Sequence, residues 1–313
     1  MKIIDNKIEI LSQLKKIGER TNIENNDEIN LTVKTILKDI KNHGDTAVKN
    51  YTLKFDGFNP EPMRVTIEEI EKAWYSTNCE LQKALKNAKN RIETFHKEQI
   101  PENISLRGVY GECVQRKWLP VNKAGIYIPG GRASYPSTVL MNAIPAKVAG
   151  VKEIIMVSPG NKEGKINQTV LAAAYITGIK NIFRIGGAQA IGALAFGTKE
   201  INKVDVISGP GNIFVTTAKK LIFGSTGIDS LAGPSEILII ADASANSSQL
   251  ATDLLAQAEH DPFAAAILLT TSLEKANEVS QKIYQKLEKH PRKEICMKSI
   301  KDWGLIGDRK SVV

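Results

Sequence analysis

Gln257 and His260 are the side chains whose types and spacing come nearest to a metal site. They lie three positions apart near the end of a predicted helix over residues 247–260, so both fall on one helix face. An amide oxygen and an imidazole nitrogen there could bind one divalent ion, but a zinc site needs a third or fourth ligand. The spacing by itself favours a contact of His260 with the helix dipole. Glu259 points about 100° away from His260, so these two neighbours do not form an acid–base dyad.

Three polar side chains lie beside glycine turns, where they could bind a nucleotide. Tyr127 lies just before one turn, Gln189 just after a second and Asn212 just after a third. Ligands of open parallel sheets bind beyond the carboxyl ends of the strands, where glycine turns let the backbone approach a phosphate. Helix capping by Asn212 and ordinary packing of the other two are the simpler interpretations of the spacing alone. The sequence has neither a complete G-x-G-x-x-G fingerprint nor a phosphate-binding P-loop.

Four predicted strands lead into glycine turns, at residues 124–128, 153–157, 181–185 and 204–207. The segments between them are rich in Ala, Leu and Val at helical spacing, which predicts right-handed β-α-β crossovers and a parallel, doubly wound sheet. A further series of two strands and two helices begins at Ser235 and predicts a second sheet. Residues 1–100 have the apolar periodicity of helices. The predicted fold class is therefore α/β with a helical N-terminal region.

The composition is that of a soluble globular chain with two domains, since the 313 residues are 42% hydrophobic and 24% charged. No apolar stretch is long enough for a secretory signal or for a membrane span of about 20 residues. We therefore expect a cytoplasmic protein with no membrane partner. The net charge of +8 would attract anionic molecules. Because the lysines alternate with acids and no arginine-rich cluster carries stacking aromatics, we expect no nucleic-acid partner.

A nucleophilic mechanism finds little support in the sequence. The three cysteines lie outside the glycine turns and suggest neither a disulfide framework nor a zinc knuckle: Cys79, Cys113 and Cys296. The chain has no G-x-S-x-G elbow either. We expect the remaining histidines to be surface residues: His43, His96 and His290.

Six ordered motifs between residues 125 and 260 resemble the histidinol dehydrogenase family. They are GIYIPGG (125–131), YPSTVLMNAIPA (135–146), GGAQAIGALA (186–195), GPGN (209–212), AGPSE (232–236) and QAEH (257–260). The resemblance runs from about residue 1 to about residue 306, and the order of the motifs makes it specific. It implies two incomplete Rossmann-like domains with parallel sheets. It also implies oxidation of L-histidinol to L-histidine with two NAD, one water and a zinc ion, in the last steps of histidine synthesis.

The resemblance assigns roles by motif match. It implies that NAD is contacted by Tyr127, Gln189 and Asn212, that Ser235 contacts the substrate, and that Gln257 and His260 bind both zinc and substrate. Zinc would hold the imidazole and amine of L-histidinol so that the carbinol carbon faces the nicotinamide.

The sequence departs from the family at its C-terminus and resembles a truncated member. The family's acid–base Glu-His pair, its other zinc ligands, Asp and His, and its small C-terminal domain have no counterpart here. We therefore assign no catalytic residue and expect no turnover, since general acid–base groups contribute about 10²- to 10⁴-fold each. Residues 308–313 fit no family pattern and equal the in-frame translation of a sequencing-adapter sequence, so our hypothesis is that they are a non-native tail. The family is homodimeric, which implies a second copy as partner.

The expected division of the chain has three parts before that tail. These are an N-terminal arm (1–20), a first Rossmann-like domain on the substrate and zinc side (21–126 with 235–307) and a second on the NAD side (127–234). Two alternative functions stay open: a relative of the family that oxidises a sulfonated propanediol, and a non-catalytic NAD-binding module. An aldehyde dehydrogenase-like enzyme is disfavoured because no cysteine lies in a glycine turn.

Overall fold

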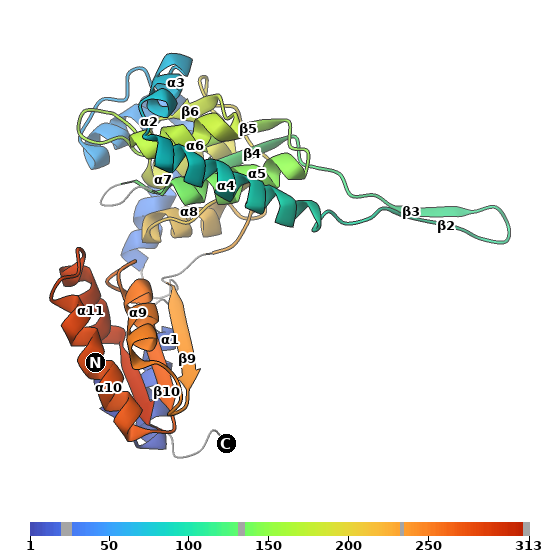
Figure 1. Ribbon diagram of the computed structural model, residues 1–313. Helices are drawn as coiled ribbons and strands as arrows, with labels where there is room; N and C mark the ends of the chain where they lie inside the picture. Colours follow the sequence, from blue (N-terminus) through green and yellow to red (C-terminus); the bar gives the residue numbers. More distant parts are fainter. Residues whose placement is uncertain (20–26, 131–134, 232–234, 309–313) are drawn as a thin grey trace. The chain divides into compact units, whose positions relative to one another are not determined.

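The computed structural model describes residues 1–19, 27–130, 135–231 and 235–308 (Figure 1). Their contacts form two compact units. Residues 1–19 and 235–308 make the smaller unit, and the described residues between 27 and 231 make the larger one. Each unit has its own parallel sheet and its own core. The predicted α/β class with two parallel sheets is confirmed.

The larger unit contains a five-stranded parallel sheet in the order β6-β5-β4-β7-β8. Its strands are β4 (Lys123–Tyr127), β5 (Glu153–Val157), β6 (Asn181–Phe183), β7 (Val206–Ser208) and β8 (Gly227–Ile228). The crossovers are α5 (Pro136–Val148), α6 (Gln168–Thr177), α7 (Gly187–Phe196) and α8 (Ile213–Ile222). The β-α-β repeat predicted from the glycine turns is therefore present, and the short β8 is an addition to it.

Helices cover both faces of this sheet because the strand residues are apolar on both sides. Tyr127 and Val157 face a core formed with α7, α8 and the long α2 (Asp27–Asp56). Ile126 and Met156 face the opposite core, formed with α5, α6, α3 (Ile67–Tyr75) and α4 (Cys79–Lys97). The apolar stripes of α2, α3 and α4 thus pack on the five-stranded sheet.

This packing corrects the expected division of the chain. Residues 27–126 belong to the unit of the five-stranded sheet rather than to that of residues 235–307. The expected boundary after residue 126 falls inside β4, the central strand. Helical periodicity identified the N-terminal helices but carried no information on which sheet they cover. The expected domain ends at residues 21 and 234 lie outside the described residues.

The smaller unit contains a four-stranded parallel sheet in the order β1-β11-β10-β9. Its strands are β1 (Lys2–Ile4), β9 (Glu236–Ala241), β10 (Ala265–Thr270) and β11 (Leu305–Asp308). One core packs with α9 (Ser247–Ala258), α10 (Leu273–Leu287) and α11 (Lys293–Trp303), and α1 (Lys7–Glu19) packs in a second core.

Both ends of the described chain take part in this sheet. The segment expected to be an N-terminal arm forms β1 and α1, because Lys2 to Ile4 pair with β11 and the apolar residues of α1 cover the sheet. Asp308, the first residue of the expected tail, is buried in β11 opposite Thr270. Residues 309–313 lie outside the described residues.

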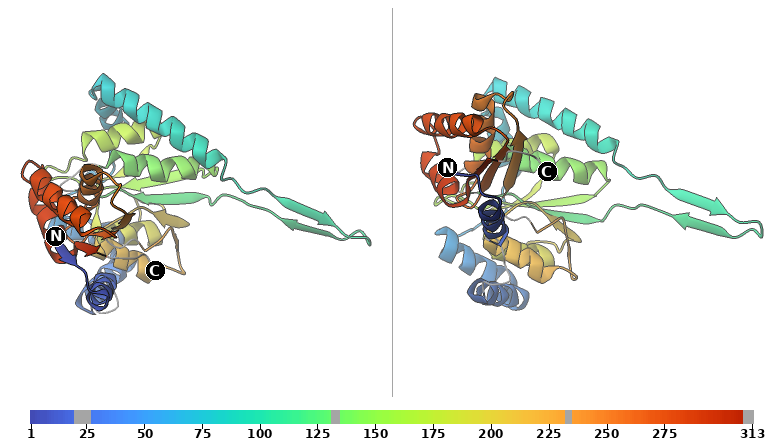
Figure 2. Two further views of the ribbon diagram at one scale, coloured as in Figure 1. Left: turned by 60° about the horizontal axis from the view of Figure 1, so that its bottom comes forward. Right: turned by 90° about the horizontal axis from the view of Figure 1, so that it is seen from below.

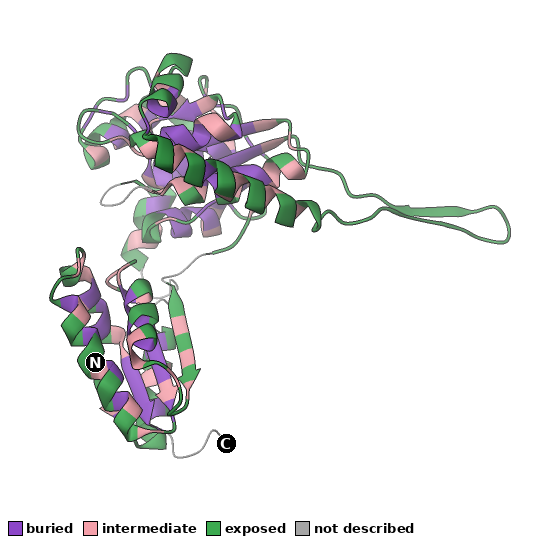
Figure 3. Cartoon of the chain, viewed as in Figure 1, coloured by how far each residue is buried: buried purple, intermediate pink, exposed green. Residues whose placement is uncertain are grey.

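A two-stranded antiparallel hairpin projects from the larger unit in every view (Figures 1 and 2). It consists of β2 (Ile104–Arg107) and β3 (Cys113–Arg116), and residues 101–122 are all exposed (Figure 3). Leu106 lies opposite Val114 on one face, and Ser105 lies opposite Gln115 on the other. The hairpin therefore has an apolar and a polar face.

Candidate functional site

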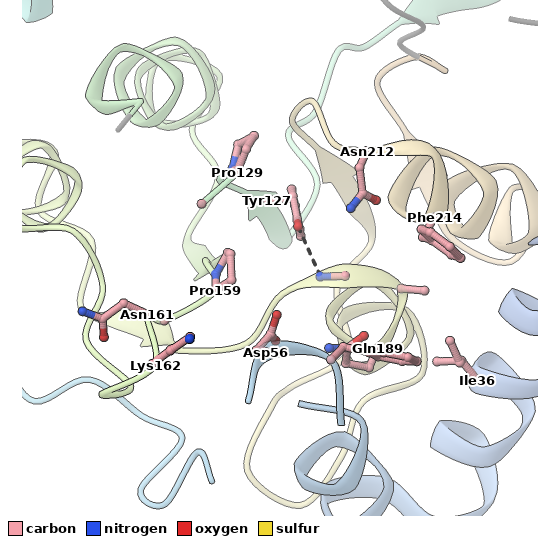
Figure 4. Close-up of a pocket in the computed structure, with 15 residues that line it drawn as sticks. Ile36, Asp56, Tyr127, Pro129, Pro159, Asn161, Lys162, Gln189, Asn212 and Phe214 are labelled. Carbon is pink, nitrogen blue, oxygen red and sulfur yellow. Dashed lines mark hydrogen bonds between the residues drawn. The ribbon is translucent and has the colours of Figure 1, made fainter. Parts of the chain in front are cut away.

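A cavity of about 620 Å³ opens at the carboxyl ends of β4 and β7 in the larger unit (Figure 4). These strands are neighbours in the sheet, but the chain leaves them toward opposite edges, through α5 to β5 and through α8 to β8. Such a reversal of strand order creates the crevice in which α/β proteins bind ligands. The volume is in the range of small-molecule sites. Tyr127, Gln189 and Asn212 all line this cavity, so three residues from separate motifs come together.

Tyr127 is fixed at the base of the cavity by one hydrogen bond. Its hydroxyl accepts from the backbone N–H of Gly187 at 3.2 Å (Figure 4). Only 4% of the residue is exposed. Burial raises the pKa of Tyr127 to about 12, against a smaller lowering by the Gly187 hydrogen bond and with a further rise from the nearby Asp56. The hydroxyl is therefore protonated at neutral pH and can donate its proton to a bound ligand.

Gln189 lies in the first turn of α7, which begins at the Gly186-Gly187 turn. Gly187 has φ of +62°, a conformation that disfavours a side chain, and the turn brings the start of the helix to the cavity. Gln189 is buried, and its amide nitrogen has no hydrogen-bond partner among the described residues. A buried donor without an acceptor is costly. A ligand in the cavity would supply the missing acceptor.

Asn212 caps α8 in addition to lining the cavity. Its Oδ1 accepts from the backbone N–H of Val215 at 3.1 Å, so the simpler interpretation of its position is confirmed. The capping bond uses the oxygen, which leaves the amide nitrogen as the group that a ligand would meet. The side chain is exposed, unlike Gln189.

An ion pair that the sequence analysis missed holds the turn before Asn212. The Lys219 ammonium, 2% exposed, donates to the carbonyl of Gly209 at 3.0 Å and pairs with the Asp229 carboxylate. Asp229 in turn accepts from the N–H of Gly209 at 2.8 Å. Gly209 has φ of +117°, and a Cβ there would lie 2.2 Å from the carbonyl oxygen of Tyr127. The pair thus fixes both peptide groups of a glycine that no other residue can replace.

One sequence signal could have revealed this pair. Lys219 lies four residues after Val215 and three before Ile222, on the buried stripe of α8. A lysine at such a position requires a buried counter-charge.

Two charged residues of the cavity were also missed. Asp56 comes from the end of α2 and Lys162 from the loop after β5. Among the described residues that line the cavity, they are the one anion and the one cation. Burial raises the pKa of Asp56 to about 6. The cavity therefore offers a cation for phosphate groups and an acceptor for hydroxyl groups.

Gln257 lies in the last turn of α9, whereas His260 lies two residues beyond the end of this helix, so the predicted helix over residues 247–260 is too long. α9 ends at Ala258, and the N–H of His260 donates to the carbonyl of Gln257 at 3.3 Å. His260 is exposed, whereas Gln257 is half-buried with an amide nitrogen that has no partner among the described residues. Ser235, the predicted substrate contact, is exposed just before β9, and its carbonyl accepts from the N–H of Ala265.

His290 is not a simple surface residue, contrary to the expectation. Its side chain is 19% exposed, its Nε2 lies 3.4 Å from a carboxylate oxygen of Glu259, and its Nδ1 lies 3.5 Å from the sulfur of Cys296. Burial raises the pKa of Cys296 to about 11, so the thiolate is scarce at neutral pH and this cysteine is a poor nucleophile. The Glu259 side chain contacts His290, which agrees with its predicted divergence from His260.

Two properties of the described residues limit the possible sites. Within residues 1–19, 27–130, 135–231 and 235–308, no three His, Cys, Asp or Glu side chains come together as a metal-binding group. None of the helices in the described part of the chain has both the length and the apolar character needed to cross a bilayer.

Comparison with known proteins identifies the family. A family model described as histidinol dehydrogenase matches residues 19–311. Histidinol dehydrogenase from Prochlorococcus marinus (strain MIT 9312) is 65% identical over 306 residues, which cover 98% of this chain and 70% of that protein. The corresponding protein of a Synechococcus species is 48% identical over 307 residues, covering 97% of this chain and 71% of the relative. The crystal structure of histidinol dehydrogenase from Elizabethkingia anophelis has a TM-score of 0.87 at 39% identity, covering 99% of this chain and 71% of that one. The chain belongs to the histidinol dehydrogenase family of oxidoreductases, as its motifs indicated.

Proposed function

We propose that this protein serves the NAD- and zinc-dependent oxidation of L-histidinol to L-histidine in the cytoplasm. The observation that carries the proposal is the convergence of Tyr127, Gln189 and Asn212 on one cavity at the strand-order reversal of the larger unit. Family membership supports the substrate. NAD, when bound, accepts the hydride in each of the two oxidations.

The cavity fits NAD in its chemistry. Gln189 offers a buried amide nitrogen in need of an acceptor, and Tyr127 offers a protonated hydroxyl. Lys162 supplies a positive charge suited to a pyrophosphate. These groups would bind and orient the dinucleotide, while the apolar walls would exclude water from it.

For zinc, the smaller unit offers two donors. Gln257 and His260 would fill two of the four positions that zinc commonly requires, and Ser235 would contact the substrate. Zinc, when bound, would supply positive charge that holds the substrate in place. Because two ligands bind zinc weakly, we expect Gln257 and His260 to need further ligands in order to retain zinc.

Replacement of Gln189 by leucine tests the NAD site. The change removes a buried donor without a protein partner, so the stability of the free protein should not fall, while NAD affinity should fall about tenfold. Titration calorimetry with NAD measures the affinity, and Gln281→Leu, at an exposed position of α10, is the control. Equal NAD affinity in all three proteins would contradict the proposed site.

The exposed hairpin supports a homodimer. An isolated two-stranded hairpin is marginally stable in water, so an apolar face formed by Leu106 and Val114 needs a cover. We propose that a second copy of the chain supplies it. Leu106→Asp should reduce the dimer fraction in light scattering, and Ser105→Asp on the polar face should not. A monomeric parent protein would refute the proposal.

A further inference from the structure

Asp56 is the one carboxylate among the described residues that line the cavity, and it lacks a partner there. One of its oxygens, Oδ2, is fully buried and accepts no hydrogen bond from any described residue. No described lysine, arginine or histidine forms an ion pair with it. In Figure 4 the carboxyl group points toward the turn where Tyr127 meets the backbone, beside Gln189.

This arrangement costs free energy in the ligand-free protein. A buried acceptor without a donor loses its hydration and gains nothing in return. The raised pKa of Asp56 has this cause alone, namely its burial. The charged and titratable groups that share its cavity are Tyr127, whose hydroxyl it influences, and Lys162. Unpaired groups of this kind in a cavity commonly meet a ligand group.

The ligand must supply hydroxyl donors to satisfy a carboxylate. The phosphates of a dinucleotide are acceptors and would be repelled by Asp56, whereas each unmodified ribose has a cis-diol with two adjacent O–H donors. Two such donors match the two oxygens of a carboxylate, and hydrogen bonds to a charged acceptor are the stronger kind.

We propose that Asp56 accepts hydrogen bonds from a ribose cis-diol of the bound dinucleotide and is a specificity residue of this site. The inference rests on the proposed NAD function. Lys162, in the same cavity, provides charge for the phosphates, so the two residues divide the recognition of sugar and phosphate between them.

The test is titration calorimetry at pH 8 with NAD and with NADP, and it needs no substrate or turnover. Asp56→Asn keeps the shape but removes the charge, and it should weaken NAD binding about tenfold or more. Glu163→Gln is the matched control, because Glu163 is an exposed carboxylate next to Lys162 that does not line the cavity. NADP, whose 2′-phosphate blocks the adenosine diol, separates the two riboses. A smaller NAD-to-NADP preference in Asp56→Asn assigns the adenosine ribose, and an equal loss for both dinucleotides assigns the nicotinamide ribose.

The melting temperature of the ligand-free variant separates binding from folding. Because Asp56 Oδ2 is buried without a partner, Asp56→Asn should leave that temperature unchanged or raise it. An affinity for NAD within threefold of the parent, or a marked fall in the melting temperature, would overturn the inference and leave the NAD site standing. Absence of NAD binding by the parent protein would instead overturn both.

Discussion

Replacement of Asp229 should destabilise the larger unit more than replacement of its partner Lys219. The side chain of Lys219 is 2% exposed and that of Asp229 is 36% exposed. Without Asp229 the ammonium keeps a buried, uncompensated charge, whereas without Lys219 the carboxylate can still reach water. Breaking a buried pair costs about 3–5 kcal/mol. We expect about 3 kcal/mol for Asp229→Asn, because asparagine keeps an acceptor for the N–H of Gly209, and about 1–2 kcal/mol for Lys219→Met.

Urea unfolding followed by tryptophan fluorescence measures these costs. Replacement of Trp303, in the smaller unit, by phenylalanine leaves Trp74 in the core of the larger unit as the main reporter, since Trp118 is already exposed on the hairpin. Lys83→Met, at an exposed position of α4, is the control for loss of a lysine and should change the free energy of unfolding by less than about 0.5 kcal/mol.

The double variant of Lys219 and Asp229 supplies the decisive comparison. Because the two groups compensate each other, the double replacement should cost less than the sum of the single ones, by about 1–2 kcal/mol. Equal costs for the two single variants, or additive costs in the double one, would refute the reasoning that burial of the ammonium sets the energy of the pair. Lys219→Met should also weaken NAD binding, since the pair fixes the turn that leads to Asn212.

The remaining predictions concern single positions of the same cavity. Tyr127→Phe removes the acceptor for the N–H of Gly187 and should cost about 1 kcal/mol in urea unfolding, together with a several-fold loss of NAD affinity. Gly209→Ala should cost at least about 2 kcal/mol more than Gly224→Ala: both glycines have positive φ, but only the former would place a Cβ against backbone. For Asp56, whose folded-state pKa of about 6 exceeds the ordinary 3.8, stability should fall as pH rises from about 4 to 6 and then level off. The gain in free energy of unfolding from Asp56→Asn should therefore be greatest above pH 6 and absent below pH 4. A gain that does not change with pH would contradict the raised pKa of Asp56.

Local sequence patterns were sufficient to predict the strands and the crossovers. β5 begins and ends at the predicted residues, because apolar runs bounded by polar or turn-forming residues determine such strands locally. The pairing of β1 with β11 was missed, since it joins residues 2–4 to residues 305–307 and no local pattern encodes a partner so distant. No local pattern encodes which sheet a helix covers either, so α2, α3 and α4 were expected on the sheet of the smaller unit.

The candidate site was predictable where glycine turns mark it, and not where charge is buried. Tyr127, Gln189 and Asn212 each adjoin a glycine turn, and the parallel topology brings those turns to one edge. Lys219 adjoins no glycine turn, and Asp56 precedes Gly57 at the end of a helix rather than a turn that follows a strand. Beyond the place of Lys219 on the apolar stripe of α8, a sequence rich in lysine and acids does not show which few are buried, because burial depends on the packing of α2 and α8 on a sheet formed elsewhere in the chain.

Three of the buried polar atoms without partners belong to residues of the candidate ligand sites, where they favour a bound ligand over the stability of the free protein. Among the described residues, Asp56 Oδ2 and Gln189 Nε2 share one cavity, and Gln257 Nε2 lies at the end of α9. Each lowers the stability of the free protein, and an apolar replacement of similar shape would remove that cost. Lys219 shows that the same unit does pair a buried charge that does not line the cavity. The unpaired acceptor and donor of the cavity therefore fit a dinucleotide that supplies both partners at once, and binding should stabilise the larger unit with the logarithm of NAD concentration once that concentration exceeds Kd.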